Sequence, residues 1–385
     1  MKKILIPIAL LLGLQAMAQH WKPLDRNIWL GPGELLFVPG NSDHMSAPGI
    51  LKSLHSGRER RLPPPPREDT FSSGFSMGVQ AAEGELFYLH ASLMAPPNPE
   101  KDKKKPFKLE IFQFDKASWR WETEPWGVLI SPRVMKPVLV SKDRVLGITA
   151  WADGFVKDGK GYPFAAFRRS QNGVFSIDFY QDCGLEKPAI KGMVGWNYPS
   201  LAQLWMDCQI ASSGDQKVIG TGYGLYWVFN AKGSLKRVIR LFEGLNEEAL
   251  QKGELWNEAV LGMQPRSDGD LLVSAFGEGT LDRVYRLLST TAGSASGKEY
   301  SERRRKALDM AMSSSSRVDW YIIDIDTGKV NLAPPPVGFP EQLKNSDAIH
   351  NFNWAFKPNG NLLMYSEKEM LKNDPAASSL KGKKK

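Results

Sequence analysis

Two short patterns recur along this chain, and together they restrict its fold more than any other feature of the sequence. The first is an apolar strand, a turn that contains Asn-Gly or Asp-Gly, and a second apolar strand. It is complete at 264–273 and 356–364, with weaker copies at 80–87 and 211–219. Asn-Gly and Asp-Gly between apolar runs indicate β-hairpins, because both turn residues need a positive φ.

The second pattern is an aromatic strand that ends in Asp or Asn and a tight turn, as at 111–119, 226–235 and 320–330. Around both patterns the apolar residues alternate with polar ones, which is typical of half-buried strands. Long helical periodicity is scarce, so the sequence predicts an all-β protein. The exception is the Ser- and Ala-rich stretch 289–317, for which we expect an inserted helical or disordered loop.

These patterns resemble the blades of β-propellers in NHL-repeat and gluconolactonase-like proteins. The run 356–364 is similar to the innermost hairpin of such a blade, and 321–330 is similar to its outer strand pair. One four-stranded sheet cannot bury both of its faces alone, so blades stack around an axis. The resemblance implies a β-propeller of about six blades, within a range of five to seven. A β-sandwich with ordinary hairpins is the alternative.

The strand pairs group into units of the size of a blade. We count five units, of which the last is incomplete. We expect the strand at 34–38 to complete that last sheet and so close the ring. We also expect a sixth or seventh blade within 137–210, which is dense in strands. The five units lie near 75–126, 137–180, 204–244, 258–336 and 349–369.

The N-terminus has the features of a cleaved export signal. Two lysines and a run of eleven apolar residues at 4–14 precede small residues at Ala16 and Ala18, which predicts cleavage between Ala18 and Gln19. Eleven apolar residues are too few to cross a bilayer, which takes about 20. The sequence therefore predicts no transmembrane span and a periplasmic or extracellular location. The expected organisation is a signal peptide at 1–18, a single propeller domain at 19–369 and a disordered basic tail at 370–385.

The chain carries a formal net charge of +8. Much of the positive charge lies in short runs beside proline-rich stretches or at the C-terminus, where charged residues are usually solvated. Attraction to acidic polymers of the cell surface is the alternative. An exported protein rarely meets nucleic acid, so we expect no nucleic-acid partner. The basic runs lie at 58–61, 101–105, 303–306 and 381–385.

The two cysteines, Cys183 and Cys208, are best interpreted as a structural disulfide. Thiols outside the cytoplasm tend to pair, and a loop of 25 positions closed in this way contributes about 3 kcal/mol. A nucleophilic thiol would need a nearby base, and no His lies between residues 90 and 350.

Candidate ligand-binding residues follow from the propeller resemblance. In propellers the residues that lead into each innermost strand crowd around the axis, where ligands usually bind. The matching residues here are Asp207, Asn257, Glu258, His350 and Asn353. In gluconolactonase-like proteins a Glu, an Asn and an Asp at such places hold a divalent metal that activates water. Glu258, Asn353 and Asp207 have the matching residue types, although such groups also commonly hydrogen-bond one another and water.

Two functions of different classes are consistent with the sequence. The first is an exported, non-catalytic propeller without a cofactor that binds an envelope or extracellular protein or glycan. The second is a hydrolase or lactonase that depends on Ca²⁺ or another divalent metal held at the pore. We favour binding, because the sequence contains no phosphate-binding loop and no complete catalytic constellation of nucleophile, base and orienting group. Its twelve Trp residues fit packing between blades at least as well as sugar stacking.

Overall fold

The computed structural model gives the conformation of most of the strand-forming part of the chain. The described residues are 27–31, 34–37, 50–53, 58–67, 78–93, 107–131, 134, 136–149, 154–184, 209–213, 215–222, 224–242, 259–266, 269–289, 302, 305–306, 309–311, 318–335, 353–356 and 362–365. Within this set no helix is long and apolar enough to cross a membrane.

The described strands form six consecutive units, each built mainly from neighbours in sequence that pair antiparallel. Blade 1 comprises β1 (Asn27–Gly31), β2 (Glu34–Phe37), β3 (Ile50–Ser53) and β4 (Glu59–Arg61). Blade 2 comprises β5 (Gly78–Ala82), β6 (Glu85–Leu93), β7 (Phe107–Asp115), β8 (Arg120–Trp121) and β9 (Gly127–Ser131). Blade 3 comprises β10 (Lys136–Ser141), β11 (Arg144–Ile148), β14 (Phe164–Arg169) and β15 (Val174–Gln181).

The remaining units continue this order. Blade 4 comprises β16 (Gln209–Ser213), β17 (Gln216–Gly220), β18 (Leu225–Phe229) and β19 (Leu235–Arg240). Blade 5 comprises β20 (Val260–Pro265), β21 (Leu271–Phe276), β22 (Val318–Ile323) and β23 (Val330–Ala333), and blade 6 comprises β24 (Asn353–Phe356) and β25 (Leu362–Tyr365). A separate hairpin of β12 (Phe155–Lys157) and β13 (Lys160–Tyr162) is inserted into blade 3.

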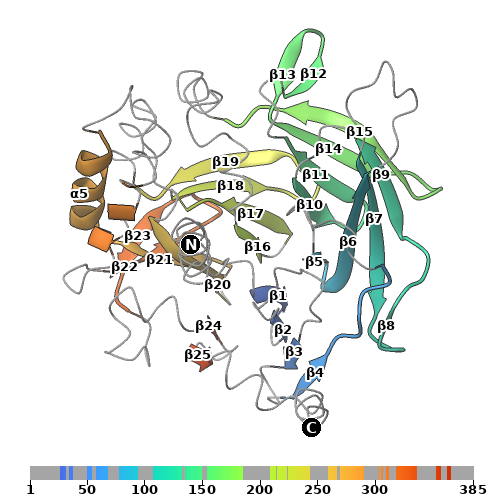
Figure 1. Ribbon diagram of the computed structural model, residues 1–385, viewed down its shortest axis with the longest axis horizontal. Helices are drawn as coiled ribbons and strands as arrows, with labels where there is room; N and C mark the ends of the chain where they lie inside the picture. Colours follow the sequence, from blue (N-terminus) through green and yellow to red (C-terminus); the bar gives the residue numbers. More distant parts are fainter. Residues whose placement is uncertain are drawn as a thin grey trace, which may run out of the picture.

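The units are arranged as the blades of a propeller. Figure 1 shows the first strand of each of blades 1 to 5 near the middle of the molecule and the later strands towards the rim. The inner strands contact one another around the axis, β1 with β5 and β16, β5 with β10, and β16 with β20. This confirms the prediction of an all-β propeller of about six blades.

The inserted loop in blade 5 is also confirmed, with a shift in position. The helix α5 (Glu278–Ser289) lies between β21 and β22, and residues 302, 305–306 and 309–311 are helical as well. The insertion therefore starts directly after β21, before the Ser- and Ala-rich stretch that predicted it. α5 buries Leu281 and Val284 in the largest apolar core, which fixes it to the sheet.

The predicted closure of the ring is wrong. The strand predicted at 34–38 is β2, which pairs with β1 and β3 in a sheet of its own. This sheet is blade 1, a unit that was not among the five predicted. The expected extra blade within 137–210 is not found among the described strands of that range, which form blade 3 with its inserted hairpin and β16, the first strand of blade 4. The N-terminal strands are short and lack an Asn-Gly or Asp-Gly turn, so the recurring pattern did not reveal them.

Blades 2 and 3 are joined at the rim and again at the centre. At the rim β9 pairs antiparallel with β7 and parallel with β15, which makes one sheet of the two blades. At the centre the side-chain amide of Gln80 on β5 donates to the Pro137 carbonyl at 2.9 Å and accepts from the Leu139 N–H at 2.8 Å. A backbone-like pair of hydrogen bonds from one side chain thus links the two innermost strands.

Apolar cores fill the spaces between blades. The largest lies among blades 3, 4 and 5 and includes the fully buried rings of Phe164, Trp227 and Phe276. A second core lies between blades 2 and 3, and a third between blades 1 and 2. In the third core Trp119 and Trp121 pack against Phe114, with ring centroids 5.2 and 4.9 Å apart. The packing interpretation of these two tryptophans is therefore confirmed.

Candidate functional site

The structure shows where the strands next to the predicted pore residues begin. β16 begins two positions after Asp207, β20 begins two positions after Glu258, and Asn353 is the first residue of β24. Asp207, Asn257, Glu258 and His350 lie outside the described residues. The ligand-binding and metal-binding roles of these residues and of Asn353 therefore stay predictions.

The predicted disulfide and cleavage site are likewise untested. Cys183 is buried, and its backbone carbonyl accepts a hydrogen bond from Trp227 Nε1 at 2.8 Å. Cys208, Ala18 and Gln19 lie outside the described residues.

The acidic turn between β22 and β23 is held by hydrogen bonds within the protein. Asp324 Oδ1 accepts from the backbone N–H groups of Asp326 and Thr327, both at 2.9 Å, and the Thr327 hydroxyl donates to Asp324 Oδ2 at 2.5 Å. The Thr327 hydroxyl bond is the main reason that the pKa of Asp324 is lowered. Over the described part of the chain, no three His, Cys, Asp or Glu side chains gather as a metal site would require.

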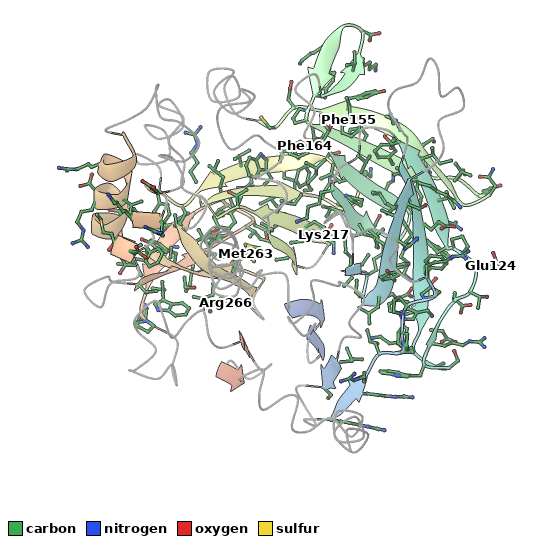
Figure 2. The ribbon with its side chains drawn as sticks, viewed as in Figure 1. Glu124, Phe155, Phe164, Lys217, Met263 and Arg266 are labelled. Atoms are coloured by element: carbon green, nitrogen blue, oxygen red, sulfur yellow. The ribbon has the colours of Figure 1, made fainter. Side chains whose placement is uncertain are left out.

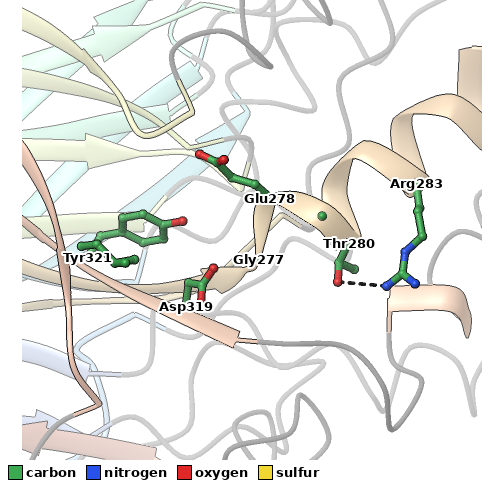
Figure 3. A pocket seen from close by; sticks show the side chains of 8 residues that line it. Gly277, Glu278, Thr280, Arg283, Asp319 and Tyr321 are labelled. Atoms are coloured by element: carbon green, nitrogen blue, oxygen red, sulfur yellow. Dashed lines mark hydrogen bonds between the residues drawn. The ribbon is translucent and has the colours of Figure 1, made fainter.

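A concave site lies instead along the outer strands of blade 5 and extends to the outer strand of blade 4. It consists of two adjoining hollows of about 700 and 780 Å³ that share Glu278, Tyr321 and Leu332, and we call it the interblade cleft. The first hollow, shown in Figure 3, is lined by Gly277, Glu278, Gly279, Thr280, Arg283, Asp319, Tyr321 and Leu332. The second is lined by Gly184, Val238, Ile239, Arg240, Leu241, Glu278, Tyr321, Gly328, Lys329, Val330 and Leu332.

The register of β22 on β23 places an aromatic ring and an aliphatic side chain side by side in the cleft. Tyr321 is paired with Leu332 across the two strands, and directly opposed residues share one face of a sheet. Tyr321 is 7% exposed and packs edge-on against Phe242 of blade 4, with ring centroids 6.0 Å apart. Leu332 is 65% exposed, the highest value among the large apolar side chains described. The cleft therefore combines a fixed ring with an open apolar contact.

The first turn of α5 forms one end of the cleft. The helix begins where the N–H groups of Thr280 and Leu281 bond to the Gly277 carbonyl at 2.8 and 3.1 Å. Arg283, one turn later, donates to the Thr280 hydroxyl at 3.4 Å (Figure 3). In Figure 3 the carboxylates of Glu278 and Asp319 lie on either side of the Tyr321 hydroxyl.

Blade 4 forms the other wall, and the two blades meet closely at one end of it. Gly328, in the turn before β23, has a φ of 81°, and a Cβ there would lie 3.3 Å from Nη1 of Arg237 on β19. Gln216 of blade 4 also donates to Asp326 Oδ1 of that turn at 2.6 Å. These contacts hold the blades together below the cleft.

The charges of the cleft are unevenly distributed. Arg240 and Lys329 line the second hollow, next to the beginning of β23, whereas Glu278 and Asp319 line the first hollow together with Arg283. Glu278 lines both hollows, so each carries both signs, but the second has two positive residues against one carboxylate and the first has two carboxylates against one arginine. Such a surface can bind a ligand through apolar contact, hydrogen bonds and charge together.

Sequence reasoning found the strands of this site but not the site itself. The strand pair at 320–330 was predicted. Because an outer strand has one unpaired edge, the exposed edge of β23 could have been predicted from the sequence. The contact of β22 and β23 with β19 had none, because it depends on how two blades approach each other.

Comparisons with known proteins add only distant likenesses. No family model matches this chain, and no curated protein matches it in sequence. Among solved structures, a putative 6-phosphogluconolactonase from Bacteroides fragilis is 10% identical with a TM-score of 0.37, covering 90% of this chain and 89% of that one. A second, from Bacteroides uniformis, is 11% identical with a TM-score of 0.38 and coverages of 88% and 89%. The WD40 β-propeller domain of Doa1 is 10% identical with a TM-score of 0.30, covering 90% of each chain. The propeller assignment therefore rests on the strand topology, and the narrower resemblance to NHL-repeat and gluconolactonase-like blades stays a prediction.

Proposed function

We propose that this protein is an exported, non-catalytic β-propeller that binds a protein or a glycan at the cell envelope, and that the interblade cleft is its binding site. The observation that carries the proposal is the joining of two hollows at Tyr321 and Leu332, where a fixed ring and an exposed aliphatic side chain line one cavity. Each hollow has the size of known ligand sites, which run from about 300 to about 1,000 Å³.

The composition of the cleft supports binding by several kinds of contact. Covering Leu332 removes apolar area from water, which is favourable for any partner that supplies an apolar group. Glu278, Asp319 and Arg240 offer charged hydrogen-bonding groups at the rim, and such groups fix the orientation of a ligand. Tyr321 is held by Phe242 before any ligand arrives, so little freedom is lost at this residue on binding.

The proposal is tested with one cleft variant and one matched control. The protein from Gln19 onward is immobilised and offered solubilised envelope proteins in one arm and purified cell-wall glycan in the other. Leu332→Asp places a charge in the cleft, whereas Val156→Asp changes a residue on the β12–β13 hairpin that is also apolar and 47% exposed. We expect Leu332→Asp to weaken binding roughly tenfold or more, which is typical of a central contact residue, and Val156→Asp to leave it unchanged.

Two results would count against this function. Binding that is equally strong in both variants would remove the cleft as the site. Binding to neither fraction would remove the function itself. Circular dichroism and thermal unfolding establish that each variant is folded, and N-terminal sequencing of the protein from producing cells tests export, because cleavage leaves Gln19 as the first residue.

The metal-dependent hydrolase or lactonase is the second candidate. It is favoured by the sequence positions of three residues of metal-ligand type. Asp207 precedes β16, Glu258 precedes β20, and Asn353 begins β24. A bound divalent ion raises the stability of the folded state by about 2.7 kcal/mol at a hundred times its dissociation constant. A stoichiometric ion whose removal by a chelator lowers the thermal midpoint, in the wild type but not in Glu258→Gln, would support the hydrolase over the binding protein.

A further inference from the structure

The outer strand of blade 5 has an open edge along the interblade cleft. Within the described structure β23 pairs only with β22. The Asp324 N–H bonds to the Lys329 carbonyl, and hydrogen-bonded pairs alternate along an antiparallel ladder. Asn331 and Ala333 therefore bond to β22, whereas the N–H and C=O groups of Val330 and Leu332 point away from the sheet.

This edge lacks the features with which proteins usually protect an exposed strand, namely charges, prolines and bulges within it. β23 has the sequence Val-Asn-Leu-Ala, and the prolines at 334–336 come only after it. The outer strands of other blades are charged, with Glu-Arg-Arg in β4 and one Lys and two Arg in β19. Among the described outer strands, β23 is thus the one that most readily accepts another strand.

The protein itself contains an example of such an addition. β15 is the outer strand of blade 3, and β9 pairs with it in parallel, with Val174 opposite Val128 and Phe175 opposite Leu129. β9 is uncharged as well and brings the apolar Leu129 into the core between blades 2 and 3. The outer edge of a blade in this propeller is therefore geometrically able to take up one more strand.

We propose that the partner of the cleft is an extended peptide segment that pairs with β23. Its backbone bonds to the N–H and C=O groups of Val330 and Leu332, and one of its apolar side chains enters the cleft over Leu332 and Tyr321. An acidic residue of the segment lies at the end of β23 where Lys329 and Arg240 line the cleft, because these two positive charges outnumber the single Glu278 carboxylate of that hollow. The inference rests on the proposed function and chooses protein over glycan as the ligand.

The test starts from a displayed library of random seven-residue peptides selected on the wild-type protein. We expect the selected peptides to alternate apolar residues and to contain an acidic residue at one end, since side chains of a strand point to alternate faces. For one selected peptide, amide hydrogen exchange is then followed residue by residue. Exchange at Val330 and Leu332 is expected to slow roughly tenfold or more on binding, as their amides become bonded, while Asn331 is protected already in the free protein.

Two variants at one position separate backbone pairing from side-chain contact. Leu332→Pro removes an N–H that points away from β22, which an edge strand tolerates, and is expected to abolish peptide binding. Leu332→Ala loses the apolar contact, as Leu332→Pro does, but keeps the N–H, and is expected to bind several-fold more tightly than Leu332→Pro because the backbone bonds remain.

The outcomes are distinguishable. Peptide binding without slower exchange at Val330 and Leu332, equal binding by Leu332→Pro and wild type, or failure of the library to yield a binder would each overturn strand pairing. Glycan binding that depends on Leu332 would preserve the proposed function while refuting the peptide. If the wild type binds neither glycan nor protein, the proposed function is refuted as well.

Discussion

Lys217 provides a quantitative test of the packing at the centre of the propeller. It lies on β17 of blade 4, is 5% exposed, and donates through Nζ to the Ala81 carbonyl on β5 of blade 2 (Figure 2). Burial lowers its pKa from 10.5 to about 8, although the charge of Glu83 opposes that change. The unfolded chain therefore binds the Lys217 proton more tightly than the folded protein does between about pH 8 and about pH 10.5.

The sign of the pH dependence follows from this difference. Stability rises with pH wherever the unfolded state binds more protons, so the contribution of Lys217 is complete above pH 10.5 and is lost as the pH falls to about 8. A fall in pKa from 10.5 to about 8 corresponds to about 3 kcal/mol, since each pKa unit is worth about 1.4 kcal/mol. The charged form of Lys217 thus destabilises the folded protein near neutral pH by about that amount.

The assay compares urea unfolding of the wild type, Lys217→Met and Lys232→Met by tryptophan fluorescence, at a series of pH values from about 7 to about 10.5. Lys232 is exposed in the turn before β19 and serves as the matched control. Relative to the wild type, Lys217→Met is expected to lose about 3 kcal/mol of stability as the pH rises through this range. At neutral pH the variant no longer carries the buried charge, but its gain in stability over the wild type is expected to be smaller than about 3 kcal/mol. The reason is that the Ala81 carbonyl loses a donor at a cost of about 1–3 kcal/mol. A stability difference between Lys217→Met and wild type that does not change with pH would refute the reasoning.

Three further predictions test the joints of the fold. Gln80→Leu removes both hydrogen bonds between β5 and β10 and is expected to lower the free energy of unfolding by about 1–3 kcal/mol, measured by urea titration; an unchanged midpoint would contradict it. Gly127→Ala would place a Cβ 2.3 Å from a ring carbon of Phe175 and is expected to cost about 1–3 kcal/mol, visible as a lower thermal midpoint. Reducing the predicted Cys183–Cys208 disulfide is expected to cost about 3 kcal/mol, and a thermal midpoint insensitive to reductant would argue against the bond.

The sequence predicted those parts of the fold that depend on local patterns. Hairpins with Asn-Gly or Asp-Gly turns, such as β20–β21 and β24–β25, form where they were expected, because turn chemistry and alternation act over a few residues. Blade 1 was not recognised as a unit, although its strand β2 was predicted at 34–38, because its strands are short and its turns lack this chemistry. The parallel pairing of β9 with β15 was missed as well, since it joins segments more than forty residues apart through contacts that no local pattern encodes.

The candidate site shows the same division. The predicted strand pair 320–330 became β22 and β23, whereas the predicted pore residues Asp207 and Glu258 lie outside the described residues. The cleft depends on the approach of β19 to the turn at Gly328, which is a property of two blades together. The burial of Lys217 had no signal either, because lysine is almost never expected inside a protein.

The interblade cleft is explained by how the neighbouring blades are joined at the rim. Between blades 1 and 2 the Trp119 indole donates to the Arg61 carbonyl at 2.9 Å, and Arg60 stacks 3.7 Å from the centre of the same ring. Between blades 3 and 4 the Leu235 N–H bonds to the Gln181 side chain at 2.8 Å. Blades 2 and 3 are joined by β9, which occupies the open edge of β15.

Blades 4 and 5 are bridged at the turn that holds Asp326 and Gly328, and among the described residues nothing occupies the edge of β23 above it. A partner strand on β23 would therefore do for blades 4 and 5 what β9 does for blades 2 and 3. It would also cover Leu332, the most exposed large apolar side chain described. On this reasoning a bound peptide should raise the thermal midpoint of the propeller as well as fill its cleft, since it binds only the folded state and completes a joint of the rim.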